Sequence, residues 1–431
     1  MSSPPGKGLG TLVAALIVGI IIGTVIGYFI PRGDVVPLSK YNELQQQLIE
    51  KEQQISQLQA KLQQLEGKKI KAAFIYVGPA GDYGWSHAHD IARRYVDNKF
   101  DWLETAYAES VSETDAPRII ERYIQEGYNV IFTTSYGFME ATIEMAEKYP
   151  DVIFFHCAGY KRAPNVGTYF AEFYQLYYLN GLMAGALTKT NKVGYVAAYP
   201  IPEVIRHINA FALGVKEVNP EAKVYVRWIF AWFDPTKARE AAEALISEGV
   251  DVLAFTEDSP TVVQVAQQHT EQGQQVYAFS HYSPMLEYGP DSVVSGQLVR
   301  WEVIYQDILG KVYLGIYNNT NLENVDYWWM LREGAVELGA AYGVPINPKF
   351  VPLLKSIKIN HPEFGEISAY DLVMKRLAQM KEETVLFDPF TGPIKDQNGK
   401  VKIPAGQRAS HDELWNMMWF VENVVGTIPQ G

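Results

Sequence analysis

Cysteine is almost absent from this chain, which has 431 residues and one cysteine, Cys157. A single cysteine excludes an intramolecular disulfide framework and also the cysteine pairs that hold structural zinc. Cys157 stands in the apolar run VIFFHCAGY, which favours a buried, inert thiol over a nucleophile. Covalent cross-links and thiol chemistry therefore play no part in the expected function.

Positive charge is also in short supply. The chain has 37 Lys and Arg residues against 49 Asp and Glu residues, which gives a net charge of −12. Such a chain is repelled by the phosphates of nucleic acids and by anionic lipid. We therefore expect no nucleic-acid partner.

Catalytic and metal-binding motifs are missing as well. The chain contains no Gly-x-Ser-x-Gly, no His-Glu-x-x-His, no P-loop and no calcium loop. Its eight histidines are scattered, and His87 and His89, two positions apart, would point to different sides of a helix. A nucleoside hydrolase or phosphorylase would need an activated nucleophile or a carboxylate cluster that holds a metal. We therefore predict no enzymatic activity, no catalytic residue, no cofactor and no metal site.

A long uncharged run does occur near the N-terminus. The nineteen-residue segment Leu12–Ile30 reads LVAALIVGIIIGTVIGYFI. At ~1.5 Å per helical residue it is just long enough to cross a hydrocarbon core of about 30 Å. It is longer than a signal-peptide core and ends in bulky residues, which favours an uncleaved anchor. The sequence predicts a single-pass transmembrane anchor over 1–33 at the cell membrane, with everything after Ile30 outside.

A heptad pattern follows the apolar run. Tyr41, Leu48, Ile55 and Leu62 share one heptad position, and Leu44, Leu58 and Leu65 share the other, while Lys51 interrupts the seam. The residues between them are mostly Gln, Glu and Lys, so the seam is the main apolar surface. We predict a coiled-coil stalk over 34–68 through which copies of the chain associate, with the number of strands left open.

From about residue 69 onward, strand-like and helix-like segments alternate. This rhythm is typical of doubly wound parallel sheets with helices on both faces. It begins at Lys71–Val77 and restarts at Lys192–Ala198, which predicts two lobes, 69–190 and 191–320, with a ligand cleft between them. The other expected strands are Val130–Thr134, Val152–His156, Val224–Ile229, Val252–Phe255 and Gln275–Phe279, and the expected helices include Ala116–Glu126, Phe138–Lys148, Phe173–Thr188, Pro202–Val218 and Pro235–Glu248.

Aromatic and polar residues recur in the loops that follow these strands. Carboxyl ends of parallel strands share one edge of a sheet, so such loops converge on the crevice. Flat rings offer stacking faces for a planar ligand, and a carboxylate such as Asp258 accepts hydrogen bonds from ring N–H groups. We expect stacking on Trp85 and Trp232 and polar recognition by Asp258. The full set of candidate ligand-binding residues is Tyr83, Trp85, Ser86, Phe138, Trp232, Asp258, His281 and Trp301.

Several of these segments occur together in a known family. The stretches GDYGWSHAHD, IFTTSYGFME, YPIPEVIRHINAFALGVKEVNP, WFDPTKA and PFTGPIKDQNGK, in this order, resemble the basic membrane protein family. Its members are the purine-nucleoside-receptor-like solute-binding proteins of ABC importers. The resemblance runs from about Ile70 to Gly426. It implies a type I periplasmic-binding-protein fold, an ABC permease as partner, and a return of 321–431 to the first lobe.

The resemblance also bears on the ligand. Nucleoside binders of the family hold the ribose with an aspartate where this chain has His156 or a neighbour of it, and with a lysine near the position of Ser295. Both groups are replaced here. The Gly-Trp, Phe-Asp-Pro and Asp-Ser-Pro motifs resemble the branch associated with free purine bases. We therefore expect a base such as adenine, with a nucleoside as the second possibility, clamped by closure of the lobes.

One alternative concerns what the bound state triggers. The same clamp could be a sensor ectodomain that signals through the stalk and the membrane anchor. Only about ten residues precede the apolar run, so a signalling role would require a separate partner. Transport is the favoured hypothesis, because a tethered binding protein with a stalk can reach a permease in the same membrane.

Overall fold

The computed structural model describes residues 38–65, 67–382, 384 and 386–429. The chain forms two compact units, Met1–Lys68 and Lys69–Gly431. The predicted membrane anchor at Leu12–Ile30 lies outside the described residues. Among the helices that are described, none combines the length and the apolar character that a membrane crossing requires.

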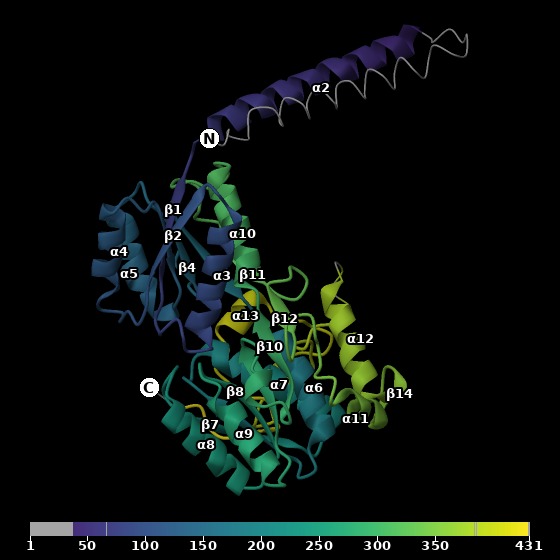
Figure 1. Cartoon of the computed structure of the whole chain (residues 1–431). Coiled ribbons are helices and arrows are strands. Elements are labelled where there is room, and N and C mark those ends of the chain that lie inside the picture. The colour runs from purple at the N-terminus through teal and green to yellow at the C-terminus, as the bar shows by residue number, and fades with distance from the viewer. Residues whose placement is uncertain (1–37, 66, 383, 385, 430–431) are drawn as a thin grey trace, which may run out of the picture. The chain divides into compact units, whose positions relative to one another are not determined.

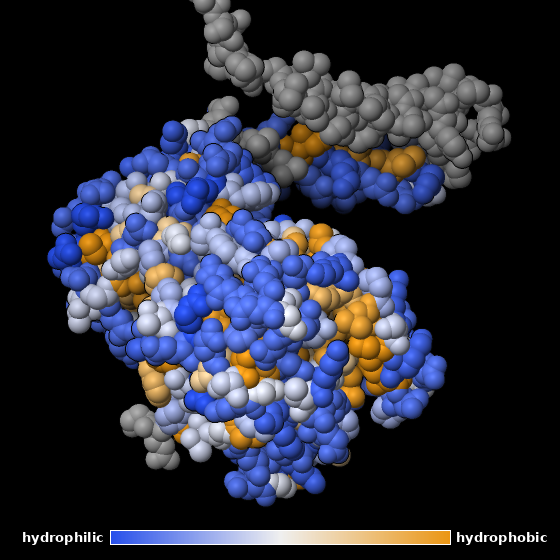
Figure 2. All heavy atoms as spheres, turned by 60° about the horizontal axis from the view of Figure 1, so that its bottom comes forward, coloured by the Kyte–Doolittle hydropathy of each residue, from blue (hydrophilic) through white to orange (hydrophobic). Residues whose placement is uncertain are grey.

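The described part of the first unit is one helix. Helix α2 spans Leu38–Leu65, 28 residues, which is the region predicted as the stalk (Figure 1). Seam residues Tyr41 and Leu48 are 54% and 37% exposed in the single chain. In the space-filling view, apolar and polar residues both face solvent along α2 (Figure 2). The helix is thus present, and its pairing with another copy stays a prediction.

The second unit begins with a six-stranded parallel sheet in the order β11-β5-β4-β3-β1-β2. Helices α3 and α10 pack together on one face and α4 and α5 on the other (Figure 1). Because both faces are covered, the strands are almost wholly apolar. The bounds are β1 Ile70–Ile75, β2 Leu103–Ala108, β3 Val130–Thr133, β4 Ile153–Cys157, β5 Val166–Ala171, β11 Asp326–Trp329, α3 Trp85–Lys99, α4 Ala116–Gln125, α5 Met139–Lys148 and α10 Trp301–Tyr313.

A second sheet forms the other lobe, in the order β12-β10-β9-β8-β6-β7-β17. Its strands are parallel except β12, which runs antiparallel to β10 at the edge. Helices α8 and α9 cover one face, and α6 and α7 cover the other. The bounds are α6 Tyr174–Leu187, β6 Lys192–Ala197, α7 Pro202–Val218, β7 Lys223–Trp228, α8 Pro235–Ser247, β8 Val252–Thr256, α9 Thr261–Glu271, β9 Tyr277–Tyr282, β10 Val293–Val299, β12 Val336–Leu338 and β17 Val424–Val425.

The chain passes between the lobes three times. It crosses from β5 through α6 to β6, returns from β10 through α10 to β11, and crosses again from β11 to β12. Every predicted strand coincides with an observed one within a few residues. The α/β class with parallel sheets is therefore confirmed.

The C-terminal segment differs from expectation. Only β11 joins the first sheet, whereas β12 and β17 join the second and α12 packs against α6. The predicted return of 321–431 to the first lobe is therefore wrong beyond Trp329. Lobe membership is decided by long-range edge pairing, which the local pattern does not contain. The remaining elements are α11 Val351–Ser356, β13 Lys358–His361, β14 Gly365–Ser368, α12 Ala369–Lys381, β15 Ile394–Lys395, β16 Val401–Ile403 and α13 His411–Trp415.

Candidate ligand-binding site

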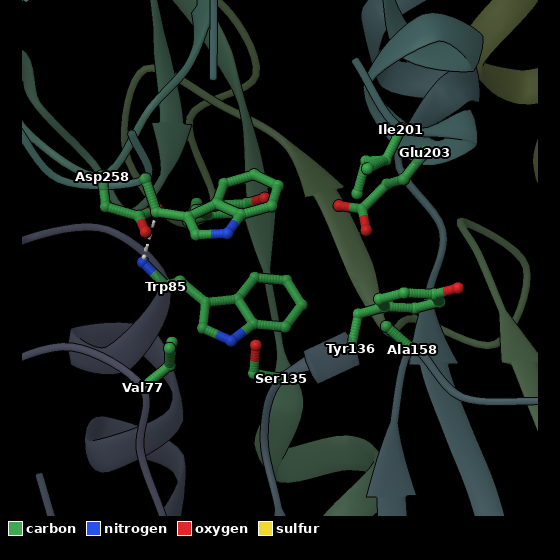
Figure 3. A pocket seen from close by; sticks show the side chains of 10 residues that line it. Val77, Trp85, Ser135, Tyr136, Ala158, Ile201, Glu203 and Asp258 are labelled. Atoms are coloured by element: carbon green, nitrogen blue, oxygen red, sulfur yellow. Dashed lines mark hydrogen bonds between the residues drawn. The ribbon is translucent and has the colours of Figure 1, made fainter. Parts of the chain in front are cut away.

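A pocket lies between the two lobes, at the carboxyl ends of strands from both sheets (Figure 3). Space of about 370 Å³, part of it open to solvent, lies among the lining residues. Each lining residue comes from a strand end, a loop or a helix start. The lining residues are Val77, Trp85, Ser135, Tyr136, Ala158, Ile201, Glu203, Trp232, Asp258 and Tyr282.

Trp85 forms the wall of the first lobe. It begins α3, is 7% exposed, and donates its indole N–H to the carbonyl oxygen of Thr134. Its ring meets Trp301 and Tyr282 edge-on at centroid distances of 5.3 and 5.2 Å. The ring is therefore held in one orientation, with its remaining surface toward the pocket.

Trp232 belongs to the second lobe and follows β7. It is half-buried and lies against Tyr199, with ring centroids 5.3 Å apart. Its carbonyl oxygen accepts the N–H of Asp258 at 2.7 Å. The pocket thus has an indole from each lobe, which suits a flat ligand.

Asp258 joins the lobes at the edge of the pocket. Its Oδ1 accepts the backbone N–H of Trp85 at 3.2 Å (Figure 3). Asp82, in the loop before α3, accepts the backbone N–H groups of Ser86 and His87 at 3.1 and 3.0 Å, and Asp258 of the other lobe adds an acceptor for the Trp85 N–H at the same helix N-terminus. Burial, with Asp82 and Glu257 adding to it, raises the pKa of Asp258 well above its ordinary value.

Glu203 is the second acid of the pocket. It lies in the first turn of α7, and its carboxyl group points toward the space between Trp85 and Tyr136 (Figure 3). Burial raises the pKa of Glu203 to about 7, with Arg206 opposing the shift and Glu172 reinforcing it. None of the described lining residues is Lys or Arg. The pocket therefore suits a ligand with N–H or O–H donors and disfavours a phosphate.

Two lining residues have unusual backbone conformations. Ala158 and Tyr282 both have φ of 60°, in the left-handed region that residues with a side chain rarely adopt. Ala158 directly follows β4, and Tyr282 is the last residue of β9. The carboxyl ends of both strands meet the pocket. Strain of about 1–3 kcal/mol per residue at a ligand site is a recurrent feature of clamps.

A buried ionic cluster lies at the first crossover. Glu172 binds Arg206 at 2.6 Å and His207 at 3.0 Å, and all three side chains are at most 1% exposed. Burial opposes ionisation of Glu172, yet Arg206 and His207 together lower its pKa to about 2. Arg206 also donates to the carbonyl oxygen of Leu414 in α13. The cluster ties α7, the crossover and the C-terminal segment together.

Of the eight predicted ligand-binding residues, the structure brings Trp85, Trp232 and Asp258 together in the pocket. Tyr83 lies outside it, 36% exposed, with its ring edge-on to Tyr288 of the second lobe at 5.2 Å.

The other four predicted residues are buried behind the pocket. Ser86 accepts the Gly78 N–H at 3.1 Å, and Phe138 is in the apolar core under α4 and α5. His281 lies 3.0 Å from the hydroxyl of Tyr177 inside the second lobe. Trp301 stacks on a histidine ring and supports Trp85 from behind. These side chains shape the site without lining it.

Sequence reasoning did not select Ser135, Tyr136, Glu203 and Tyr282. The first two lie in the same loop as the selected Phe138, and Tyr282 follows His281, so the prediction selected a neighbour of the lining residue in each of these loops. Glu203 lies within the family segment PIPEVIRH. The helix dipole favours an acidic residue in the first turn of any helix, so the sequence alone does not distinguish a ligand-binding acid from an acid that only stabilises the helix.

The site does not have the composition of a metal centre. Within the described ranges, no three His, Cys, Asp or Glu side chains are grouped so that they could hold a metal ion. Two doubly wound lobes, three crossovers and a pocket between them define a two-lobed ligand-binding protein.

Comparison with known proteins then gives the family. The model of the PnrA-like ABC transporter substrate-binding proteins matches residues 69–356. The chain belongs to this family, which confirms the resemblance to the basic membrane protein family and places the chain among substrate-binding proteins rather than enzymes.

Individual relatives support the same assignment. A purine-binding protein of Brucella abortus is 36% identical over 368 residues, 84% of this chain and 95% of the relative. A Haloferax volcanii protein, provisionally named an ABC transporter glucose-binding protein, is 42% identical over 282 residues, 65% of this chain and 69% of the relative. A solute-binding protein structure from Aeropyrum pernix matches with a TM-score of 0.60 and 17% identity, covering 80% of this chain and 95% of that one.

Proposed function

We propose that this protein captures a purine outside the cell for an ABC importer, with a free base such as adenine preferred over a nucleoside. The observation that carries the proposal is the pair Trp85 and Trp232, one indole from each lobe, in one pocket. Stacking of a base on an aromatic ring is worth about 1–3 kcal/mol. A ligand held by both rings would stabilise the closed arrangement of the lobes.

Polar recognition falls to Asp258 and Glu203. A purine base presents several ring and exocyclic N–H groups along its edge, and carboxyl oxygens accept them. The absence of Lys and Arg from the described lining argues against a nucleotide, whose phosphates would meet two acids. The ligand classes that fit the pocket are therefore a free base and a nucleoside.

The surroundings of the pocket favour the free base. His156, at the position where family members hold ribose with an aspartate, is engaged with the carbonyl oxygen of Ser135 at 2.8 Å. Ser295, where a lysine was expected, is buried and donates to the carbonyl oxygen of Pro345 at 2.6 Å. Both side chains are buried, and neither lines the pocket.

The N-terminal region completes the proposal. We propose that the apolar run Leu12–Ile30 anchors the protein in the cell membrane and that α2 associates with the same helix of another copy. The exposure of the seam residues Tyr41 and Leu48 supports the second part. Transport is preferred over sensing because the matched family consists of ABC transporter proteins.

Calorimetric titration tests the ligand assignment. Residues 69–431 form a compact unit with its own apolar core, so this fragment is suitable after denaturation and refolding to remove carried-over ligand. Adenine, adenosine and glucose are compared, the last because of the Haloferax relative. We expect one-to-one binding of adenine, weaker binding of adenosine and none of glucose. Binding of glucose alone would refute the purine assignment, and tighter adenosine binding would refute the preference for the free base.

A further inference from the structure

Glu203 has an unusual position for an acid in a binding pocket. Across the described residues, no side-chain or backbone group donates a hydrogen bond to its carboxyl group, although Asp258 on the opposite side accepts one from Trp85. The Glu203 side chain is half-buried and points into the pocket (Figure 3). A carboxylate that receives no hydrogen bond gains nothing from the protein to offset its lost hydration.

The charged groups around Glu203 do not compensate. Arg206, one turn further along α7, is the nearby cation, but it is paired with Glu172 at 2.6 Å. Asp258 is a second acid of the same pocket. Asp412 and Tyr160 line the adjoining space together with Glu203, and Tyr136 lines the pocket itself. Tyr195, Tyr282 and Cys157 are further titratable neighbours, which are neutral when protonated and repel the ionised Glu203 when they are not. None of these groups is a cation.

We propose that Glu203 binds the ligand as a neutral carboxylic acid, whose carbonyl oxygen accepts an N–H and whose hydroxyl donates to an adjacent acceptor. This inference rests on the proposed purine ligand and states which hydrogen bonds recognise that ligand. In the neutral form a carboxyl group offers one donor beside one acceptor, as the side chain of Gln does.

The neutral acid selects one class of purines. Adenine carries an amino group beside a ring nitrogen, the pattern that Asn and Gln recognise with two hydrogen bonds. Hypoxanthine carries a carbonyl oxygen beside a ring N–H, which fits the same carboxyl group with the roles of its oxygens exchanged. Guanine carries this same pair and, in addition, two adjacent donors, its ring N–H and its amino group, which match an ionised carboxylate. Adenine and hypoxanthine are therefore the ligands expected to depend on the neutral acid, whereas guanine fits the ionised form as well.

Proton linkage makes the inference measurable. The pKa of Glu203 in the free protein is raised by burial to about 7, and a ligand that binds only the protonated form raises it further. Affinity is then fully present below about pH 7 and declines by up to about tenfold per pH unit above it. Each binding event above about pH 7 takes up as much as one proton.

The experiment is a series of calorimetric titrations with adenine between about pH 6 and about pH 8.5, in buffers with different ionisation enthalpies. Adenine itself stays neutral across this range, so the proton change belongs to the protein. The variant Glu203→Gln keeps one donor beside one acceptor at every pH. The variant Glu221→Gln, at an exposed carboxylate just after α7, is the matched control.

We expect the wild type and Glu221→Gln to lose affinity with rising pH and to take up a proton. Glu203→Gln should bind adenine as tightly as the wild type does at low pH, and it should lose the pH dependence and the proton uptake that come from Glu203. Binding by the wild type that is independent of pH, or that strengthens as pH rises, would overturn the inference while leaving the purine assignment intact. If no purine binds at any pH, the proposed function itself fails, and this inference fails with it.

Discussion

Gly84 is a position where one added methyl group would report on contact between the lobes. An alanine Cβ at Gly84 would lie 2.5 Å from Cα and 2.6 Å from Cβ of Asp258. Both atoms belong to the other lobe; Cα is main chain and the position of Cβ is fixed by the main chain, so neither can rotate away. At Gly81, in the same loop, an added Cβ would have nothing within 4 Å. The change Gly84→Ala should therefore prevent full closure, and Gly81→Ala is its matched control.

The size of the effect follows from the geometry. Ordinary carbon contacts are about 3.5–4.0 Å, so the lobes must separate locally by about 1 Å. The 3.2 Å hydrogen bond from the Trp85 N–H to Asp258 would then stretch beyond hydrogen-bond range. Burial favours the neutral form of Asp258, and a hydrogen bond between neutral groups contributes about 0.5–1.5 kcal/mol, or about a 2- to 12-fold change in affinity. We expect this contact to be released when the lobes open, so the melting temperature of the unliganded protein should change little.

Calorimetric titration with adenine measures the affinity, and small-angle X-ray scattering with and without ligand measures closure. We expect Gly84→Ala to bind about 2- to 12-fold more weakly and to compact less on binding, while Gly81→Ala behaves as the wild type. If Gly84→Ala binds and compacts as Gly81→Ala does, the contact between Asp258 and the start of α3 is not part of the bound state.

Further predictions concern stacking, the ionic cluster and the stalk. Trp232→Ala should reduce adenine affinity by about 1–3 kcal/mol with little change in melting temperature, because Trp232 is half-buried. Trp85→Ala should instead lose about 3–5 kcal/mol of stability in chemical denaturation, because that ring is also core, and equal effects of the two changes would contradict this distinction. The pKa of Glu172 is lowered from 4.5 to about 2 in the folded protein, so its ionised form stabilises the fold above about pH 4.5. The free energy of unfolding should therefore fall as the pH drops from about 4.5 towards 2. If Glu172→Gln shows the same pH profile as the wild type, this prediction is wrong. Residues 34–431 should sediment as an oligomer and residues 69–431 as a monomer, and equal masses would refute association through α2.

The sequence determined most of the local architecture. Short β-branched and aromatic runs marked strands such as Val252–Thr256 because a sheet covered on both faces accepts little else. The heptad spacing marked α2 in the same way. The loops that build the pocket were also found, because the carboxyl ends of parallel strands meet at one edge whatever the details of the fold.

Only the tertiary structure decided which side chain of each loop lines the pocket. Ser135 and Phe138 are three residues apart, yet one lines the pocket and the other is under α4 and α5. Glu203 became a ligand candidate only when α7 was placed opposite Trp85. Such choices, like the pairing of β17 with β7, depend on contacts between segments far apart in the chain. Residue type and periodicity reflect contacts with the nearest few residues along the chain, so they predict helices and strands. Which side chains meet in the pocket depends on long-range packing.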